Sequence, residues 1–291
     1  MGKPDESNNH LRQSTANFRV PFVVPSEIYP SVWKHIIEAA RNSEQEMVER
    51  FKQVASVQAE FEEQWKEQWN RTSQGVAEAV KRTLLRVKLL GELGWTMPME
   101  MSWPEFQALA MEDDLTVERV NQWFVTYYTE DNASGFKRLA GGLLSSRQLD
   151  FWKLLVRQCV RAFEKGDFAL CVPSLLLILE GSIAKPWGVT FENPKTRRVF
   201  FERKLSAAAS GSIKEYKWRS VQGFTDSVFG RKGSPTKLHR HLILHGKSDP
   251  ATWDRAYCLR LFQAISTVVS LSKESLAVRI ERNRKSASSH R

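Results

Sequence analysis

Apolar residues recur at three- and four-residue intervals along most of the chain, which is the spacing of amphipathic helices. The first such run covers residues 31–70, where the apolar positions are separated mainly by Glu, Gln and Arg. The apolar positions are Val32, Ile36, Ala39, Ala40, Met47, Phe51, Val54, Phe61 and Trp65. The intervals contain gaps and are not strict heptads, so we expect this helix to pack on its own domain. A coiled-coil or partner-docking arm is the alternative.

Capping and turn residues divide the rest of the chain into further helices. Gly75 is expected to end the first one. Ser102 and Glu105 have the spacing of a capping box, and Asp113 or Asp114 is expected to cap the helix after it. Further helices are expected at residues 76–93, 148–165, 168–184, 194–209, 213–229, 235–245 and 251–283.

The pattern indicates an all-α fold, because no alternating strand pattern persists and no repeat of 20 to 50 residues appears. Residues 168–184 are apolar on all sides, which predicts a central buried helix. The expected organisation is an extended arm, a helical N-terminal region, a helical bundle and a basic tail. These cover residues 1–30, 31–147, 148–283 and 284–291.

Composition favours a reduced, soluble protein with a large core. Of the 291 residues, 42% are hydrophobic, and they include 10 Trp and 16 Phe. Cys159, Cys171 and Cys258 have no paired or metal-like spacing, so we expect reduced core cysteines, no zinc and a cytoplasmic location. No apolar run reaches the ~20 residues needed to span a bilayer, so no membrane is expected.

The net charge of +10 is unevenly placed along the chain. Residues 1–150 contain 17 Lys and Arg against 22 Asp and Glu, which gives −5. Residues 151–291 contain 26 against 11, which gives +15. This asymmetry favours a polyanion bound by the C-terminal half, most simply a nucleic acid. An acidic protein or a lipid surface is the alternative, because charge alone selects no ligand.

One aromatic cluster lies in the acidic half. Trp123, Phe124, Tyr127 and Tyr128 could form a base-stacking platform, although their helical spacing favours a place in the core. Gly141 and Gly142 follow no strand and lack the patterns of phosphate-binding loops, so no nucleotide loop is expected.

The segment 234–246 contains three of the six histidines and an arginine. Ser234 can cap a helix whose first residue is Pro235, and Gly246 can end it. The segment therefore predicts a short helix bounded by its own start and stop signals.

One half of this short helix carries groups suited to cleaving a phosphodiester. At about 100° per residue, Arg240, His241 and His245 fall within a sector of about 140°. An imidazole exchanges protons near neutral pH, and a guanidinium is a permanent two-pronged partner for phosphate.

With these three positions the segment resembles the HEPN superfamily of helical nucleic-acid-associated domains, many of which are metal-independent RNases. The family motif is an Arg, usually followed by a polar residue, with a His four to six residues after the Arg. Arg240, His241 and His245 match it. The resemblance extends loosely over residues 150–283, and the N-terminal half has no assigned motif.

The resemblance implies an endoribonuclease that uses neither metal nor cofactor. Arg240 would orient the scissile phosphate, and His245 would act as general base or acid for attack by the 2′-hydroxyl. The products would be a 2′,3′-cyclic phosphate and a 5′-hydroxyl. His241 would orient the phosphate or its neighbours, and His239 would be a solvated basic neighbour. The family also implies a homodimer with a composite cleft and, by analogy, a toxin or antiviral role.

Supporting residues are expected around this helix. Glu180 interrupts an apolar helix, so it is expected either to hold Arg240 or to face water near the helix end. The basic residues expected to bind RNA are Arg197, Arg198, Arg203, Lys204, Arg231, Lys232 and Lys237.

Other interpretations of the same residues remain open. So short a motif also arises by chance, and Arg284 with His290 fits it in the polar tail. Arg240 and His245 would then belong to a solvated or structurally satisfied helix end. The alternative functions are a non-catalytic HEPN-like module, which binds nucleic acid, a nucleotide or a protein through the acidic half, and a purely structural scaffold.

Overall fold

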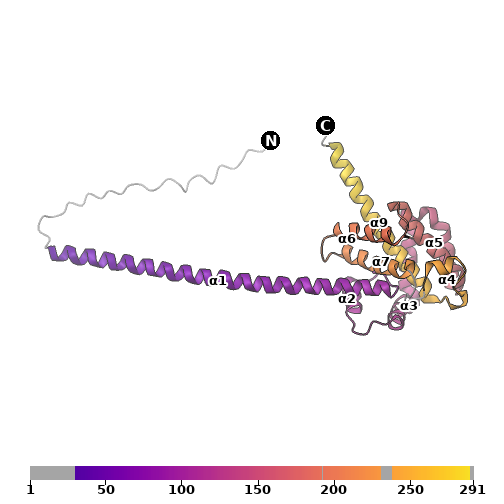
Figure 1. Cartoon of the computed structure of the whole chain (residues 1–291), viewed down its shortest axis with the longest axis horizontal. Coiled ribbons are helices and arrows are strands. Elements are labelled where there is room, and N and C mark those ends of the chain that lie inside the picture. The colour runs from indigo at the N-terminus through magenta and orange to yellow at the C-terminus, as the bar shows by residue number, and fades with distance from the viewer. Residues whose placement is uncertain (1–29, 192, 231–237, 289–291) are drawn as a thin grey trace. The chain divides into compact units, whose positions relative to one another are not determined.

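The structure is a computed structural model that describes residues 30–191, 193–230 and 238–288 (Figure 1). The described residues contain helices and no strand, which confirms the all-α prediction. The expected extended arm lies outside them, apart from its last residue. The chain divides into two units, Met1–Thr72 and Ser73–Arg291. The helices are α1 (Pro30–Glu92), α2 (Trp103–Ala110), α3 (Val117–Ser145), α4 (Lys153–Lys165), α5 (Phe168–Trp187), α6 (Pro194–Ser206), α7 (Ile213–Phe229), α8 (Arg240–Leu244) and α9 (Arg255–Ser288), with 3-10 helices η1 (Arg147–Trp152) and η2 (Pro250–Thr252).

Helix α1 joins the two N-terminal helices that the sequence separates. The predicted break at Gly75 is wrong, because a single glycine in a helix costs only about 1 kcal/mol relative to alanine. Among the described residues, the apolar face of the N-terminal part of α1 does not pack on a domain of its own. Met47, Phe61 and Trp65 are more than half exposed, and α1 is the only element described in the first unit.

The C-terminal end of α1 is buried in the second unit, where its backbone meets that of α7. A Cβ atom at Gly91 would overlap the carbonyl oxygen of Ser220, and one at Gly223 would overlap that of Lys88. Glycine at both positions therefore lets α1 and α7 cross with their backbones in contact, and larger residues would push the two helices apart.

Two predicted helix starts have different outcomes. α2 begins where expected: the Ser102 backbone N–H donates to the Glu105 carboxylate over 3.0 Å. The cap expected at Asp113 or Asp114 is wrong, because Thr116 precedes α3 and its hydroxyl accepts from the Arg119 backbone N–H at 3.2 Å.

Helix α5 packs against both α4 and α9, which confirms its central place, but the prediction that it is buried on all sides is wrong (Figure 1). Leu175, Leu176 and Leu179 are fully buried. One side nevertheless reaches the surface, where Leu170 and Leu177 are exposed. By length and composition, α5 is the one helix among the described residues that could cross a membrane.

The second unit also includes residues before the boundary expected near residue 147. α3 packs against α9, so the helices on either side of that position share one core. Within α3, Phe124 and Tyr128 are fully buried, as the core interpretation expects. The three cysteines are buried and free, and burial raises the pKa of the Cys159 thiol to about 12.

Candidate functional site

The motif segment forms a single helical turn. Helix α8 covers only Arg240–Leu244, which is shorter than the predicted helix, and the expected cap at Ser234 and Pro235 lies outside the described residues. Leu238 and Ile243 are buried and anchor the turn on the core. Gly246 closes it with φ of +64°, a backbone conformation that glycine adopts without strain.

Arg240 and Glu180 form an ion pair between α8 and α5. The Arg240 Nε donates to Glu180 Oε1, and Nη2 donates to Oε2 over 3.3 Å. The two side chains are 19% and 27% exposed. The predicted contact between these residues is therefore present, and the guanidinium is held in one orientation by a two-point pair.

A glycine next to Glu180 explains how η1 packs against this part of α5. A Cβ atom at Gly181 would overlap the indole of Trp152, so only glycine leaves room for that ring. The Nζ atom of Lys185, one turn further along α5, lies 5.3 Å from the ring centre of Phe151. Aromatic side chains of η1 thus cover the end of α5 that carries Glu180.

His241 and His245 lie side by side at the surface. Their ring centroids are 4.4 Å apart, and both residues are exposed. The pairing follows from the helical turn, because the His245 backbone N–H donates to the His241 carbonyl at 3.2 Å. Loss of ring hydration lowers the pKa of His241, and repulsion from His245 and Lys247 lowers it further. A histidine shifted in this way is mostly neutral at pH 7.

Two neighbours differ from the sequence interpretation. His239 is not a fully solvated residue: it is half-buried, and its Nδ1 is buried with no hydrogen-bond partner among the described residues. Lys247, exposed two residues after His245, adds positive charge that is not part of the predicted motif. Its place directly after Gly246 is the only sequence signal for it.

The predicted basic patch on α6 is only partly a surface. Arg197 is buried: its Nε donates to Asp226 at 3.1 Å, and its Nη1 donates to the carbonyls of Phe191 and Phe229. Its assignment to nucleic-acid binding is therefore wrong. These three acceptors make the Arg197 side chain a structural tie between α6, α7 and the chain before them.

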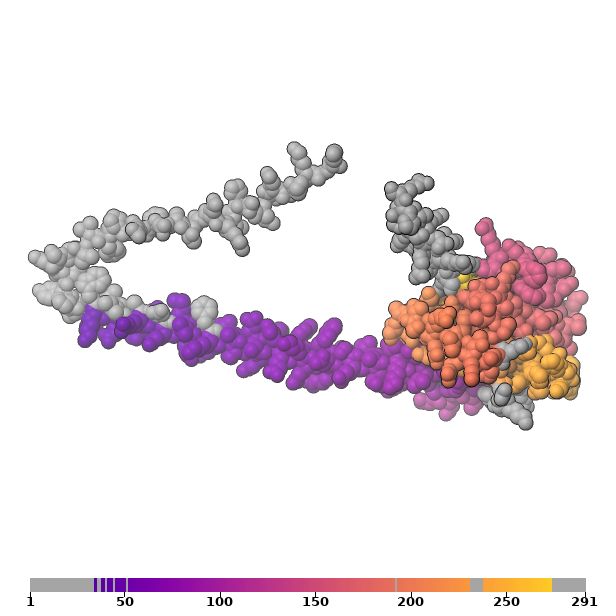
Figure 2. Space-filling model, turned by 45° about the horizontal axis from the view of Figure 1, so that its top comes forward, coloured from indigo at the N-terminus to yellow at the C-terminus, as the bar shows by residue number. Residues whose placement is uncertain are grey.

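The other α6 cations are more accessible, and α6 and α7 form one surface in Figure 2 (orange). Arg203 is exposed, and Arg198 is exposed beside Glu202 at 3.6 Å. Lys204 is half-buried, with its Nζ 5.2 Å from the ring centre of Trp187. Burial, followed by repulsion from other cations, lowers the pKa of Lys204.

Several predicted positions lie outside what the structure describes. These are Arg231, Lys232, Lys237 and the rival motif histidine, His290. Within the described residues, no group of three His, Cys, Asp or Glu side chains could hold a metal ion.

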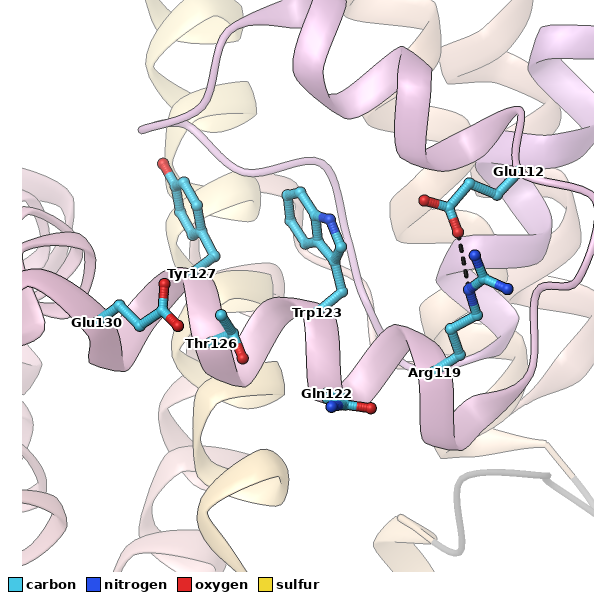
Figure 3. Close-up of a pocket in the computed structure, with 7 residues that line it drawn as sticks. All are labelled: Glu112, Arg119, Gln122, Trp123, Thr126, Tyr127 and Glu130. Atoms are coloured by element: carbon cyan, nitrogen blue, oxygen red, sulfur yellow. Dashed lines mark ion pairs between the residues drawn. The ribbon is translucent and has the colours of Figure 1, made fainter.

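A hollow lies on α3, away from the motif in sequence. Figure 3 shows Trp123 and Tyr127 side by side, with the Glu112–Arg119 ion pair beyond them. The two rings are nearly parallel and their centroids are 5.7 Å apart, which is too close for a base to enter between them. The hollow, of about 480 Å³, is therefore a weaker candidate than α8.

Comparisons with known proteins identify no family. No protein-family model, no curated protein and no solved structure matches the chain.

Proposed function

We propose that the protein is a metal-independent endoribonuclease of the HEPN type. The observation that carries the proposal is the exposed pair His241 and His245, directly beside an arginine whose orientation is fixed by Glu180. Two neighbouring imidazoles can supply both a proton acceptor and a proton donor. Attack of a 2′-hydroxyl on the adjacent phosphodiester requires both, because the 2′-oxygen loses a proton and the 5′-oxygen gains one.

The lowered pKa keeps the ring of His241 unprotonated near neutral pH, which is the form that a general base needs. In this mechanism His241 takes the proton from the 2′-hydroxyl while the 2′-oxygen bonds to phosphorus. The bond to the 5′-oxygen breaks, and His245 gives that oxygen its proton. The products are a 2′,3′-cyclic phosphate and a 5′-hydroxyl. Arg240 stabilises the negative charge that develops on the phosphate oxygens.

Exposed cations of the second unit would bring RNA to the protein surface. Lys247, Arg198 and Arg203 are exposed in the second unit, and the C-terminal half is strongly basic. The family resemblance supports a homodimer with both motif turns in one cleft, and the composition supports a cytoplasmic location.

A non-catalytic module that binds nucleic acid, a nucleotide or a partner protein is the second candidate. The observation that favours it is the ion pair itself, because Glu180 offsets the charge of Arg240. In that case the histidines would contact a bound phosphate without transferring protons.

The test is incubation of purified protein with end-labelled RNA in EDTA, followed by analysis of the new ends. Cyclic phosphate and 5′-hydroxyl ends are expected, together with full resistance of RNA that carries 2′-deoxyribose at the cleaved position. Binding without cleavage would favour the second candidate. Cleavage of the deoxy-substituted strand would exclude the mechanism.

A further inference from the structure

The first unit carries a mainly apolar stripe along α1. Met47, Val54, Val57, Phe61, Trp65 and Trp69 are each more than half exposed. At about 100° per residue they fall within a sector of about 120°. Arg50 is the only charged residue in that sector between Met47 and Trp69.

The stripe is large enough to require an explanation. It is about 33 Å long, and its six side chains expose on the order of 700 Å². That area is close to the roughly 800 Å² that each partner contributes to a stable interface of standard size. Contiguous apolar patches of this size mark binding surfaces in soluble proteins.

The opposite face of α1 is hydrophilic and carries both signs of charge. Lys52 pairs with Glu49 at 3.3 Å, and Arg71 pairs with Glu67 at 3.1 Å. Residues 30–72 contain six Lys and Arg against eight Asp and Glu. A helix that binds anionic lipid or nucleic acid would carry an excess of basic residues on this face, and here the excess is acidic.

We propose that the stripe pairs with the same stripe of a second copy of this chain, as a two-helix coiled coil. A second copy offers an apolar surface of the same length with the same near-neutral flanks. Met47, Val54 and Phe61 follow one another at seven-residue intervals, and Trp65 and Trp69 continue at intervals of four. This interface is distinct from any dimer formed through α8 and does not depend on RNA cleavage.

The test compares two valines of the same helix in the full-length protein. Val54 lies near the middle of the stripe, and Val48 is also exposed but lies outside the stripe, about 120° around the helix from Val54. Sedimentation equilibrium at micromolar concentrations should show a dimer for the wild type and for Val48→Glu. Val54→Glu should weaken dimerisation at least tenfold, and Phe61→Glu combined with Trp65→Glu should give monomers. Circular dichroism checks that the second unit stays folded.

Several outcomes would overturn the proposal. A wild type that is monomeric at 100 μM would do so, as would equal effects of Val48→Glu and Val54→Glu. If the full chain is monomeric and deletion of residues 1–29 makes it dimeric, the N-terminal segment is the occupant instead. A further outcome would assign the stripe to a membrane surface. In that case the wild type would be monomeric and would co-sediment with neutral phosphatidylcholine vesicles, and Val54→Glu would abolish the co-sedimentation.

Discussion

Glu180 and Arg240, sixty residues apart in the sequence, meet in a two-point ion pair that fastens the single turn of α8 to the central helix α5. Because α8 is too short to be stable alone, its position depends on this pair and on two buried side chains, Leu238 and Ile243. The pair and these two side chains together thus position the motif histidines.

A double-mutant cycle measures this relationship. Glu180→Ala and Arg240→Ala should each lower the free energy of unfolding by about 1–3 kcal/mol, because each leaves a largely buried charge without its partner. The double variant should lose less than the sum of the two. Urea unfolding provides the measurement, and strictly additive losses would show that the two side chains do not interact in solution.

His241 should titrate below its ordinary pKa. Partial desolvation lowers this pKa first, and repulsion from nearby cations adds to the shift. Proton NMR of the ring should therefore give a midpoint below 6.5. Lys247→Met removes one repelling charge and should raise the midpoint toward that value. A wild-type midpoint above 6.5 would remove the argument for His241 as the base.

The contact between α1 and α7 should tolerate no side chain. Gly91→Ala and Gly223→Ala each place a methyl group against backbone atoms and should destabilise the second unit by about 1–3 kcal/mol or more. Gly75→Ala is the matched control on the same helix, since nothing lies within 4 Å of its new methyl group. It should be neutral or stabilise by up to about 1 kcal/mol. Equal thermal shifts for Gly75 and Gly91 variants would contradict the observed crossing.

Arg197 and Arg198 are adjacent in sequence but should behave differently. Arg198→Gln should weaken RNA binding and reduce the slope of log affinity against log salt by about one, while stability stays unchanged. Arg197→Gln should instead destabilise the fold, because it removes the bonds to Asp226, Phe191 and Phe229. Fluorescence anisotropy across a salt series, together with thermal melts, separates the two effects.

Much of the helical pattern could be predicted from the sequence. The period of the apolar residues identifies α7 with both bounds correct, and the capping box at Ser102 identifies the start of α2. The break at Gly75 was wrong because one glycine is a weak local signal. The contacts divide the chain after Thr72 and not near residue 147, because local composition does not reveal that α3 packs on α9.

The candidate site was only partly predictable. The spacing of Arg240 and His245 located the turn, and the cost of a carboxylate in an apolar helix indicated Glu180 as a partner. The burial of Arg197 could not be predicted. A basic residue on a basic helix has the same sequence pattern whether it faces water or, like Arg197, donates hydrogen bonds to three acceptors elsewhere in the fold.

Single-turnover cleavage of labelled RNA in EDTA by His245→Ala tests the central claim most directly. The matched control is His35→Ala, which removes an exposed histidine on α1 that has no assigned role. His245→Ala should cleave 10²–10⁴-fold more slowly than the wild type, the usual cost of losing a positioned acid or base, with unchanged RNA affinity. His35→Ala should match the wild type. Wild-type cleavage by His245→Ala would contradict the assignment.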